Sequence, residues 1–158
     1  MPIMVKCDKW PGESTIDGFS TYFEVSSFQF GVGRGIGSAF GGSTREGSIA
    51  SVSEITFTKV TDKSSIKIFE DSLHGELDRK VEIAFVRTGA GNTPAAYITI
   101  KLEGCGISGY SISSGGDRPS ESISLNFDKI EYTYEAMGDN LNGEPLKYSW
   151  DLATAKGA

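Results

Sequence analysis

The sequence predicts a mainly β fold, a double sheet or a barrel, with one short helix and one long glycine-rich loop. Three observations lead to this prediction. Strand-like runs separated by turn residues follow one another along the 158 residues, a spacing typical of β-sandwiches and barrels. Two of these runs are too long for one flat strand and change face midway. One segment has the period of a helix.

Eight runs combine alternating apolar positions with flanking turn residues. The predicted strands are Ile3–Cys7, Thr21–Phe30, Ile49–Thr58, Lys80–Arg87, Ala96–Leu102, Ile107–Ser113, Glu121–Glu135 and Leu146–Asp151.

The longest predicted strand changes parity near Asp128. Ile123 and Leu125 alternate on one face, whereas Ile130 and Tyr132 alternate on the other. Because a shift of one residue moves the apolar set to the opposite face, the run must contain a bulge or bend. It therefore serves two sheets or turns a barrel corner. Residues 21–30 show the same switch.

The segment "TDKSSIKIFEDSLHGEL" has helical spacing, with Ile66, Phe69 and Leu73 at i, i+3 and i+7. Asp62 or Ser64 can cap its start, and Gly75 can end it. We expect this apolar stripe to pack on the wall of the β structure, as a lid over an open end.

Seven of the 20 glycines lie between Gly31 and Gly47. The segment predicts a long extended loop (31–47) without periodic structure, and such loops in compact domains are usually functional or disordered. A flexible linker is normally polar. The loop instead carries Val32, Arg34, Ile36 and Phe40, which favours docking, although a floppy hairpin remains an alternative.

Length and charge restrict the function classes. A chain of 158 residues is expected to form a single domain (1–158). The net charge of −6 argues against nucleic acid or an anionic membrane surface as a partner. No apolar run reaches the length of a membrane helix, so no membrane insertion is expected. No conventional secretory signal opens the sequence, so we expect cytoplasmic synthesis and any export by a route that accepts the folded protein.

Enzyme signatures are weak. Cys7 and Cys105 lack metal-ligand spacing and are expected to be reduced, packed thiols. His74 is the only histidine and is expected to face the carbonyls at the helix end, although Glu70 and Asp71 could flank it. No catalytic residue, metal or cofactor is predicted. A glycan-binding module using an exposed aromatic residue such as Trp10, and a hydrolase using a pair of carboxylates, stay as rival hypotheses.

The turn "SGGDRPSES" places Asp117, Arg118 and Glu121 close together around Pro119. The arginine fork recognises carboxylates, so Arg118 could pair with an acidic group across a subunit boundary. A local pair with Asp117 or Glu121 is the equally weighted alternative.

Four motifs in order resemble one known family. They are "YFEVSSFQFGVGR" (22–34), "FTKVTDKSSIKIFEDSLHG" (57–75), "SSGGDRPSESISLNFDKIEYTY" (113–134) and "YSWDL" (148–152). The chain resembles the haemolysin-coregulated protein (Hcp) family, the tube proteins of bacterial type VI secretion systems, collinearly over nearly its whole length.

The resemblance implies a small closed β-barrel of two sheets with a flanking helix, assembled as a homohexamer whose rings stack into a tube. It implies spike and sheath components as partners, effector proteins in the lumen, and secretion through the apparatus without a signal peptide. The 31–47 segment corresponds to the family's ring-contact loop, with Val32, Arg34, Ile36 and Phe40 as candidates for stacking. A phage-type tail-tube protein is the alternative with a similar fold.

Overall fold

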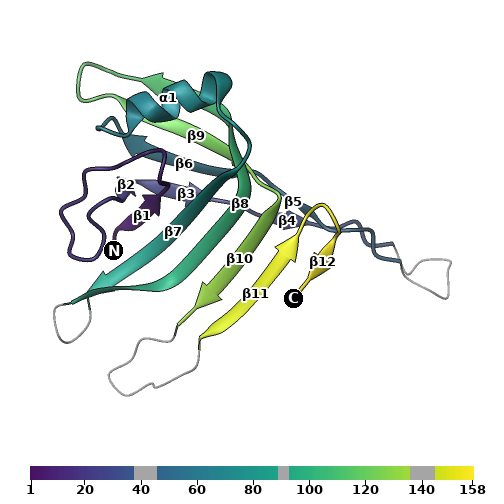
Figure 1. The fold of residues 1–158 in the computed structure, drawn as a ribbon. Coiled ribbons are helices and arrows are strands. Elements are labelled where there is room, and N and C mark those ends of the chain that lie inside the picture. Colours follow the sequence, from purple (N-terminus) through teal and green to yellow (C-terminus); the bar gives the residue numbers. More distant parts are fainter. Residues whose placement is uncertain (38–45, 89–92, 136–144) are drawn as a thin grey trace.

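The computed structural model describes residues 1–37, 46–88, 93–135 and 145–158. Within them the chain is mainly β with one short helix, which confirms the predicted class (Figure 1). The elements are β1 (Ile3–Lys6), β2 (Phe23–Val25), β3 (Ser27–Gln29), β4 (Val32–Gly33), β5 (Ser51–Val52), β6 (Ile55–Val60), α1 (Ser65–His74), β7 (Arg79–Thr88), β8 (Pro94–Ser113), β9 (Ser120–Asn126), β10 (Lys129–Tyr134), β11 (Leu146–Asp151) and β12 (Lys156–Gly157).

Antiparallel pairing links most of the strands. One run of neighbours follows the order β12-β11-β10-β8-β7-β1-β2. A second run leads from β8 through β9 and β6 to β3. Strand β8 therefore belongs to both runs, because its first half pairs with β7 and β10 and its second half pairs with β9.

Both predicted parity switches are confirmed. Ser26 separates β2, which pairs with β1, from β3, which pairs with β6. Residues 127–128 separate β9, which pairs with β6, from β10, which pairs with β11. In each case the change of face marks the point where the chain passes from one run of strands to the other.

Strand β8 corrects the sequence-based prediction, which had divided it into two strands. It is continuous over 20 residues, and the glycines near its centre bend it without reversing it. Gly104 has φ +61°, a left-handed conformation that glycine adopts without steric cost. A Cβ atom at Gly104 would lie 2.4 Å from Asp128 Oδ2, so the strand also passes close to the β9–β10 junction.

Two hydrophobic clusters flank the sheet that contains β1 and β7. The larger one includes Phe57, Ile83 and Ile100, and it also buries Cys7 and Cys105 as free thiols. The smaller one lies on the opposite face of β1 and β7, where Phe19 and Tyr22 cover Met4 and Ala84. The prediction of reduced, packed cysteines is thus confirmed.

The apolar stripe of α1 was predicted on the wrong side. Ile66, Phe69 and Leu73 are 48% to 72% exposed, whereas Ser65 and Ile68 are buried. The helix lies along the end of the fold next to β9 (Figure 1). It faces the strands with Ser65, which makes specific hydrogen bonds, and with Ile68, which packs in the larger cluster. Phe69 keeps one aromatic contact, with its ring centroid 5.8 Å from that of Tyr110.

The described part of the glycine-rich segment is a paired ribbon, not a loop without periodic structure. Strands β4 and β5 pair, with Val32 opposite Val52, and Ile36 bridges to Gly47 farther out. Serine hydroxyls accept from glycine amides along it, as in Gly35 N–H to Ser48 Oγ at 2.8 Å. The ribbon projects away from the rest of the fold (Figure 1). Phe40 lies outside the described residues.

Candidate assembly site

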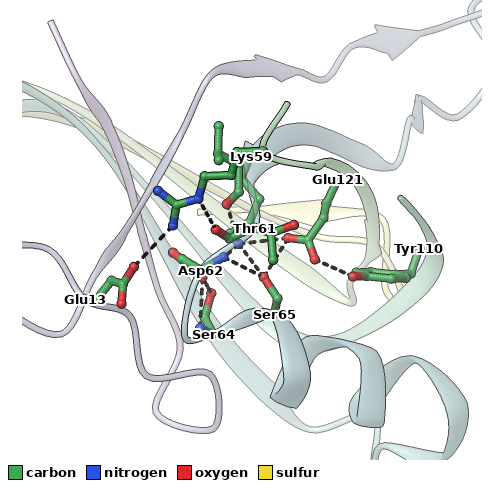
Figure 2. Close-up of polar contacts among 10 residues, drawn as sticks. Glu13, Lys59, Thr61, Asp62, Ser64, Ser65, Tyr110 and Glu121 are labelled. Atoms are coloured by element: carbon green, nitrogen blue, oxygen red, sulfur yellow. Dashed lines mark hydrogen bonds and ion pairs between the residues drawn. The ribbon is translucent and has the colours of Figure 1, made fainter. Parts of the chain in front are cut away.

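A buried charged network joins α1 to three strands (Figure 2). We call it the Lys59 network, and its members are Lys59, Asp62, Ser65, Tyr110 and Glu121. The Lys59 ammonium lies 2.9 Å from Glu121 Oε2 and 2.9 Å from Asp62 Oδ1. It also donates to Ser65 Oγ at 3.0 Å. The side chains of Lys59 and Glu121 are completely inaccessible to solvent.

Glu121 is satisfied at both carboxylate oxygens. Ser65 Oγ donates to Oε2 at 2.8 Å, and the Tyr110 hydroxyl donates to Oε1. Burial raises the pKa of Tyr110, and the bond to the Glu121 carboxylate raises it further. Because Lys59, Ser65, Tyr110 and Glu121 come from β6, α1, β8 and β9, the network fixes these four elements to one another.

Asp62 organises the start of α1. Its Oδ1 accepts from the Ser64 amide at 2.9 Å as well as from Lys59. The Asp62 amide donates to Ser65 Oγ at 2.9 Å. Ser64 is the residue before the helix, as predicted, but its side chain makes no capping bond to the helix, and its hydroxyl donates to Asp62 instead.

The structure separates the predicted set in the 114–122 turn. Arg118 is 65% exposed and lies 3.7 Å from Glu13 Oε1, while its Nε donates to the Thr61 carbonyl at 3.0 Å. Asp117 is also exposed. Glu121 is buried in the Lys59 network, so the local Arg118–Glu121 pair does not form. Asp117 and Arg118 are the members of this set that face solvent.

The three described ribbon candidates are all exposed, but they differ in their contacts. Val32 lies at the base of the ribbon and Ile36 farther out. Arg34 Nε donates to the Ser48 carbonyl at 3.0 Å. Its guanidinium lies over Gly47, where a Cβ atom would be 2.0 Å from Arg34 Nη2. Arg34 thus packs on its own ribbon, with its guanidinium over Gly47.

A row of alternating charges crosses one face of the larger run of strands. Lys6 lies opposite Glu82, Glu82 opposite Lys101, and Lys101 opposite Glu131. Lys147 Nζ completes the row 3.3 Å from Glu131 Oε2. Opposite charges on neighbouring strands attract, so this row is nearly balanced in charge, and it lies beside the smaller hydrophobic cluster on the same face of β1 and β7.

The structure places two of the residues named for rival functions, Trp10 and His74. Trp10 is fully buried, with its Nε1 donating to Asp71 Oδ2 at 2.6 Å, so it cannot stack on a sugar. His74 is exposed at the end of α1. Among the described residues, no group of three or more His, Cys, Asp or Glu side chains is placed to hold a metal ion. No helix in this part of the chain is long and apolar enough to cross a membrane.

Sequence reasoning missed Lys59, although a signal was present. Lys59 shares its parity with the buried Ile55 and Phe57, and Glu121 shares its parity with the buried Ile123. Period-two alternation therefore pointed both charges inward. A charge at an inward position needs an opposite partner, and each of these residues is the other's.

The fold and the site define a mainly β protein that is stabilised by a buried charged network. Its exposed ribbon and apolar faces are surfaces that another protein chain can contact. The chain belongs to the Hcp family of type VI secretion, because a family model described as "Type VI secretion system effector, Hcp" matches residues 4–134. Among curated proteins, it is 28% identical over 105 residues to protein hcp1 of Pseudomonas aeruginosa. That alignment spans 64% of this chain and 64% of the relative's length.

Solved structures show the same fold. A protein described as a type six secretion system protein is 26% identical, with a TM-score of 0.89 over 99% of both chains. Hcp1 from Salmonella typhimurium is 19% identical, with a TM-score of 0.77 over 99% of this chain and 98% of that one.

Proposed function

We propose that the chain is a structural subunit of a type VI secretion tube, forming homohexameric rings that stack. The observation that carries the proposal is the family match over residues 4–134, supported by fold similarity over 99% of the chain to a type six secretion system protein. The whole chain, residues 1–158, would act as one domain.

In this proposal the two runs of strands close into one small barrel. From β8 the pairing runs through β7 and β1 to β2, and in the other direction through β9 and β6 to β3. Only Ser26 separates β2 from β3, and its amide donates to the Thr58 carbonyl on β6 at 2.7 Å. That bond continues the hydrogen bonding between β2 and β3, where the chain passes from one run of strands to the other. Closure of the barrel removes sheet edges that would otherwise promote aggregation.

The ribbon is proposed to make contacts between rings, through Val32, Arg34, Ile36 and Phe40. Asp117 and Arg118 are proposed to contact a neighbouring subunit. Effector proteins would occupy the lumen, and spike and sheath components would contact the tube. The role is that of a passive conduit without catalysis or a cofactor, and the subunit would leave the cell through the apparatus itself.

Light scattering and electron microscopy of the purified chain test this function. The expected mass is near six times the 16.9 kDa of one chain, with annular particles in the images. A chain that stays monomeric over a wide range of concentration would contradict the proposal.

A further inference from the structure

The apolar face of the larger sheet runs past the edge of the core. Directly opposed residues share a face in antiparallel pairs, and one such row is Ile83, Ile100, Tyr132 and Tyr148. The first two residues are buried at 0% and 1% exposure, whereas Tyr132 and Tyr148 are 41% and 57% exposed. The row therefore begins in the core and ends in solvent.

The next row along these strands behaves in the same way. Phe85 and Ile98 pack against the main cluster, but Tyr134 and Leu146, which continue the row, are 42% and 72% exposed. Strands β10 and β11 thus extend an apolar face beyond the elements that cover it.

The base of the ribbon turns this face into a groove, which we call the β10–β11 groove. Its floor is formed by Ile130, Tyr132, Tyr148 and Trp150, and Val32 and Val52 stand along its wall. The described side chains around it are almost entirely apolar, and Val32 is 62% exposed.

The exposed area of the groove matches that of the largest apolar patches found on monomers, which are often functional. Five side chains contribute to it, namely Val32, Tyr132, Tyr134, Leu146 and Tyr148. With roughly 200 Å² for a large side chain, their exposed fractions amount to on the order of 500 Å². The largest apolar patch of a typical monomer is about 300–600 Å² and is often functional, and one side of a standard protein interface buries about 800 Å².

We propose that the β10–β11 groove is the seat of a second copy of this chain, side by side in the same ring. The inference rests on the proposed function and names the surface that it uses. The exposed apolar area of the groove is more than half of the area that one partner buries in a standard interface. This area is larger than a single inserted side chain would cover. The groove is also continuous with the core, because Tyr132 and Tyr148 extend the row that contains the buried Ile100. A second folded copy would therefore cover the groove in the way that the protein interior covers Ile100.

The rest of the molecule fits a head-to-tail contact. Such a ring needs two different surfaces on each copy. The exposed stripe of α1, with Ile66, Phe69 and Leu73, provides a second apolar surface at another end of the fold (Figure 1). The contact moves Val32 from the proposed contact between rings to the contact within a ring, because Val32 lines the groove, whereas Arg34 and Ile36 lie farther out on the ribbon.

The test introduces a charge into the groove and, as a matched control, on the other face of the same strand. Val32→Glu and Tyr148→Glu place a carboxylate where a docked copy would bury it without a partner, which is costly. Thr133→Glu lies between Tyr132 and Tyr134 in sequence but on the polar face, opposite Lys147. Circular dichroism confirms folding of each variant, and light scattering gives its oligomer size over a dilution series.

Both groove variants are expected to raise the concentration at which half of the oligomer dissociates by about 100-fold or more, and Thr133→Glu to leave it near the wild-type value. Folded groove variants that keep the wild-type oligomer overturn the inference and leave the proposed function intact. A wild-type chain that is monomeric throughout overturns both. A wild-type dimer that the groove variants dissociate supports the groove and contradicts the ring.

Thiol labelling gives a second measurement. Cys7 and Cys105 are buried, so a Leu146→Cys variant presents one accessible thiol. Its labelling by a maleimide is expected to be at least about tenfold slower in the oligomer than in diluted monomer. Equal rates in the two states would overturn the inference.

Discussion

Replacing Lys59 by methionine removes the only cation from a network that holds two carboxylates. Glu121 is fully buried, and the Asp62 side chain is 12% exposed. In the variant both carboxylates lose their ion pair, while methionine fills most of the space left by the lysine stem. The strands and α1 should therefore remain in place, with an uncompensated negative charge between them.

The expected loss is large. Removing one partner of a buried ion pair costs about 3 to 5 kcal/mol. For a chain of this length each kcal/mol lowers Tm by about 2 to 4 °C, so Tm should fall by roughly 6 to 20 °C. Glu121→Gln should cost less, about 1 to 3 kcal/mol, because Lys59 keeps Asp62 at 2.9 Å.

The assay is urea unfolding followed by circular dichroism, with all variants at one protein concentration, because assembly itself stabilises the folded chain. Lys67→Met is the matched control. Its ammonium lies 3.2 Å from Glu70 Oε2, and both side chains are about half exposed. This exposed pair should contribute no more than about 0.5 kcal/mol.

Two outcomes would refute the reasoning. One is a Lys59→Met variant whose unfolding free energy falls by less than about 1 kcal/mol, within a few tenths of the Lys67→Met value. The other is a Glu121→Gln variant that loses as much as Lys59→Met, since the structure leaves Lys59 with a second carboxylate partner.

Three further predictions concern pH and the bend in β8. Hydrogen bonds from Arg79, and then from Trp10, lower the pKa of Asp71. The stability that this group contributes is therefore present above pH about 4 and is lost as the pH falls further. Asp71→Asn should reduce the dependence of the unfolding free energy on pH in this acidic range. Burial raises the pKa of Cys105 to about 12 from an unfolded value near 9. The stability that the protonated thiol contributes is therefore present below pH 9 and is lost as the pH rises toward 12. Cys105→Ala should reduce the fall of the unfolding free energy with pH in this range, and an unchanged pH dependence would contradict the assignment. Gly104→Ala places a Cβ atom at φ +61° and should lower the unfolding free energy by about 1 to 2 kcal/mol in urea titration, whereas no change would show that the bend tolerates a side chain.

The sequence predicted the bends of the β structure better than the extent of each strand. A parity switch is a local signal, and at Ser26 and at residues 127–128 it marked the passage between the two runs of strands. Glycine is ambiguous, because it can end a strand or bend one. The glycines at 104 and 106 were therefore interpreted as a break, although the pairing of β8 with β7, β10 and β9 keeps the strand continuous.

The errors at the site have a common physical origin in long-range pairing. An apolar stripe normally identifies the buried side of a helix, but α1 buries Ser65, which bonds to Lys59 and Glu121. Glu121 was predicted as a partner of Arg118, across a subunit boundary or in a local pair, but its partner in the structure is Lys59, 62 residues away in sequence. Only the folded chain shows that these charges satisfy each other.

Strand β8 has a mechanical consequence. It runs through both halves of the β structure for 20 residues, about 66 Å at 3.3 Å per residue if it were straight. Hydrogen bonds of antiparallel ladders lie perpendicular to the strands, so a force along β8 shears many of them together instead of opening them one after another. A thrust in that direction is carried from one half of the molecule to the other through a single continuous backbone, which bends at Gly104 and stays paired on both sides of the bend.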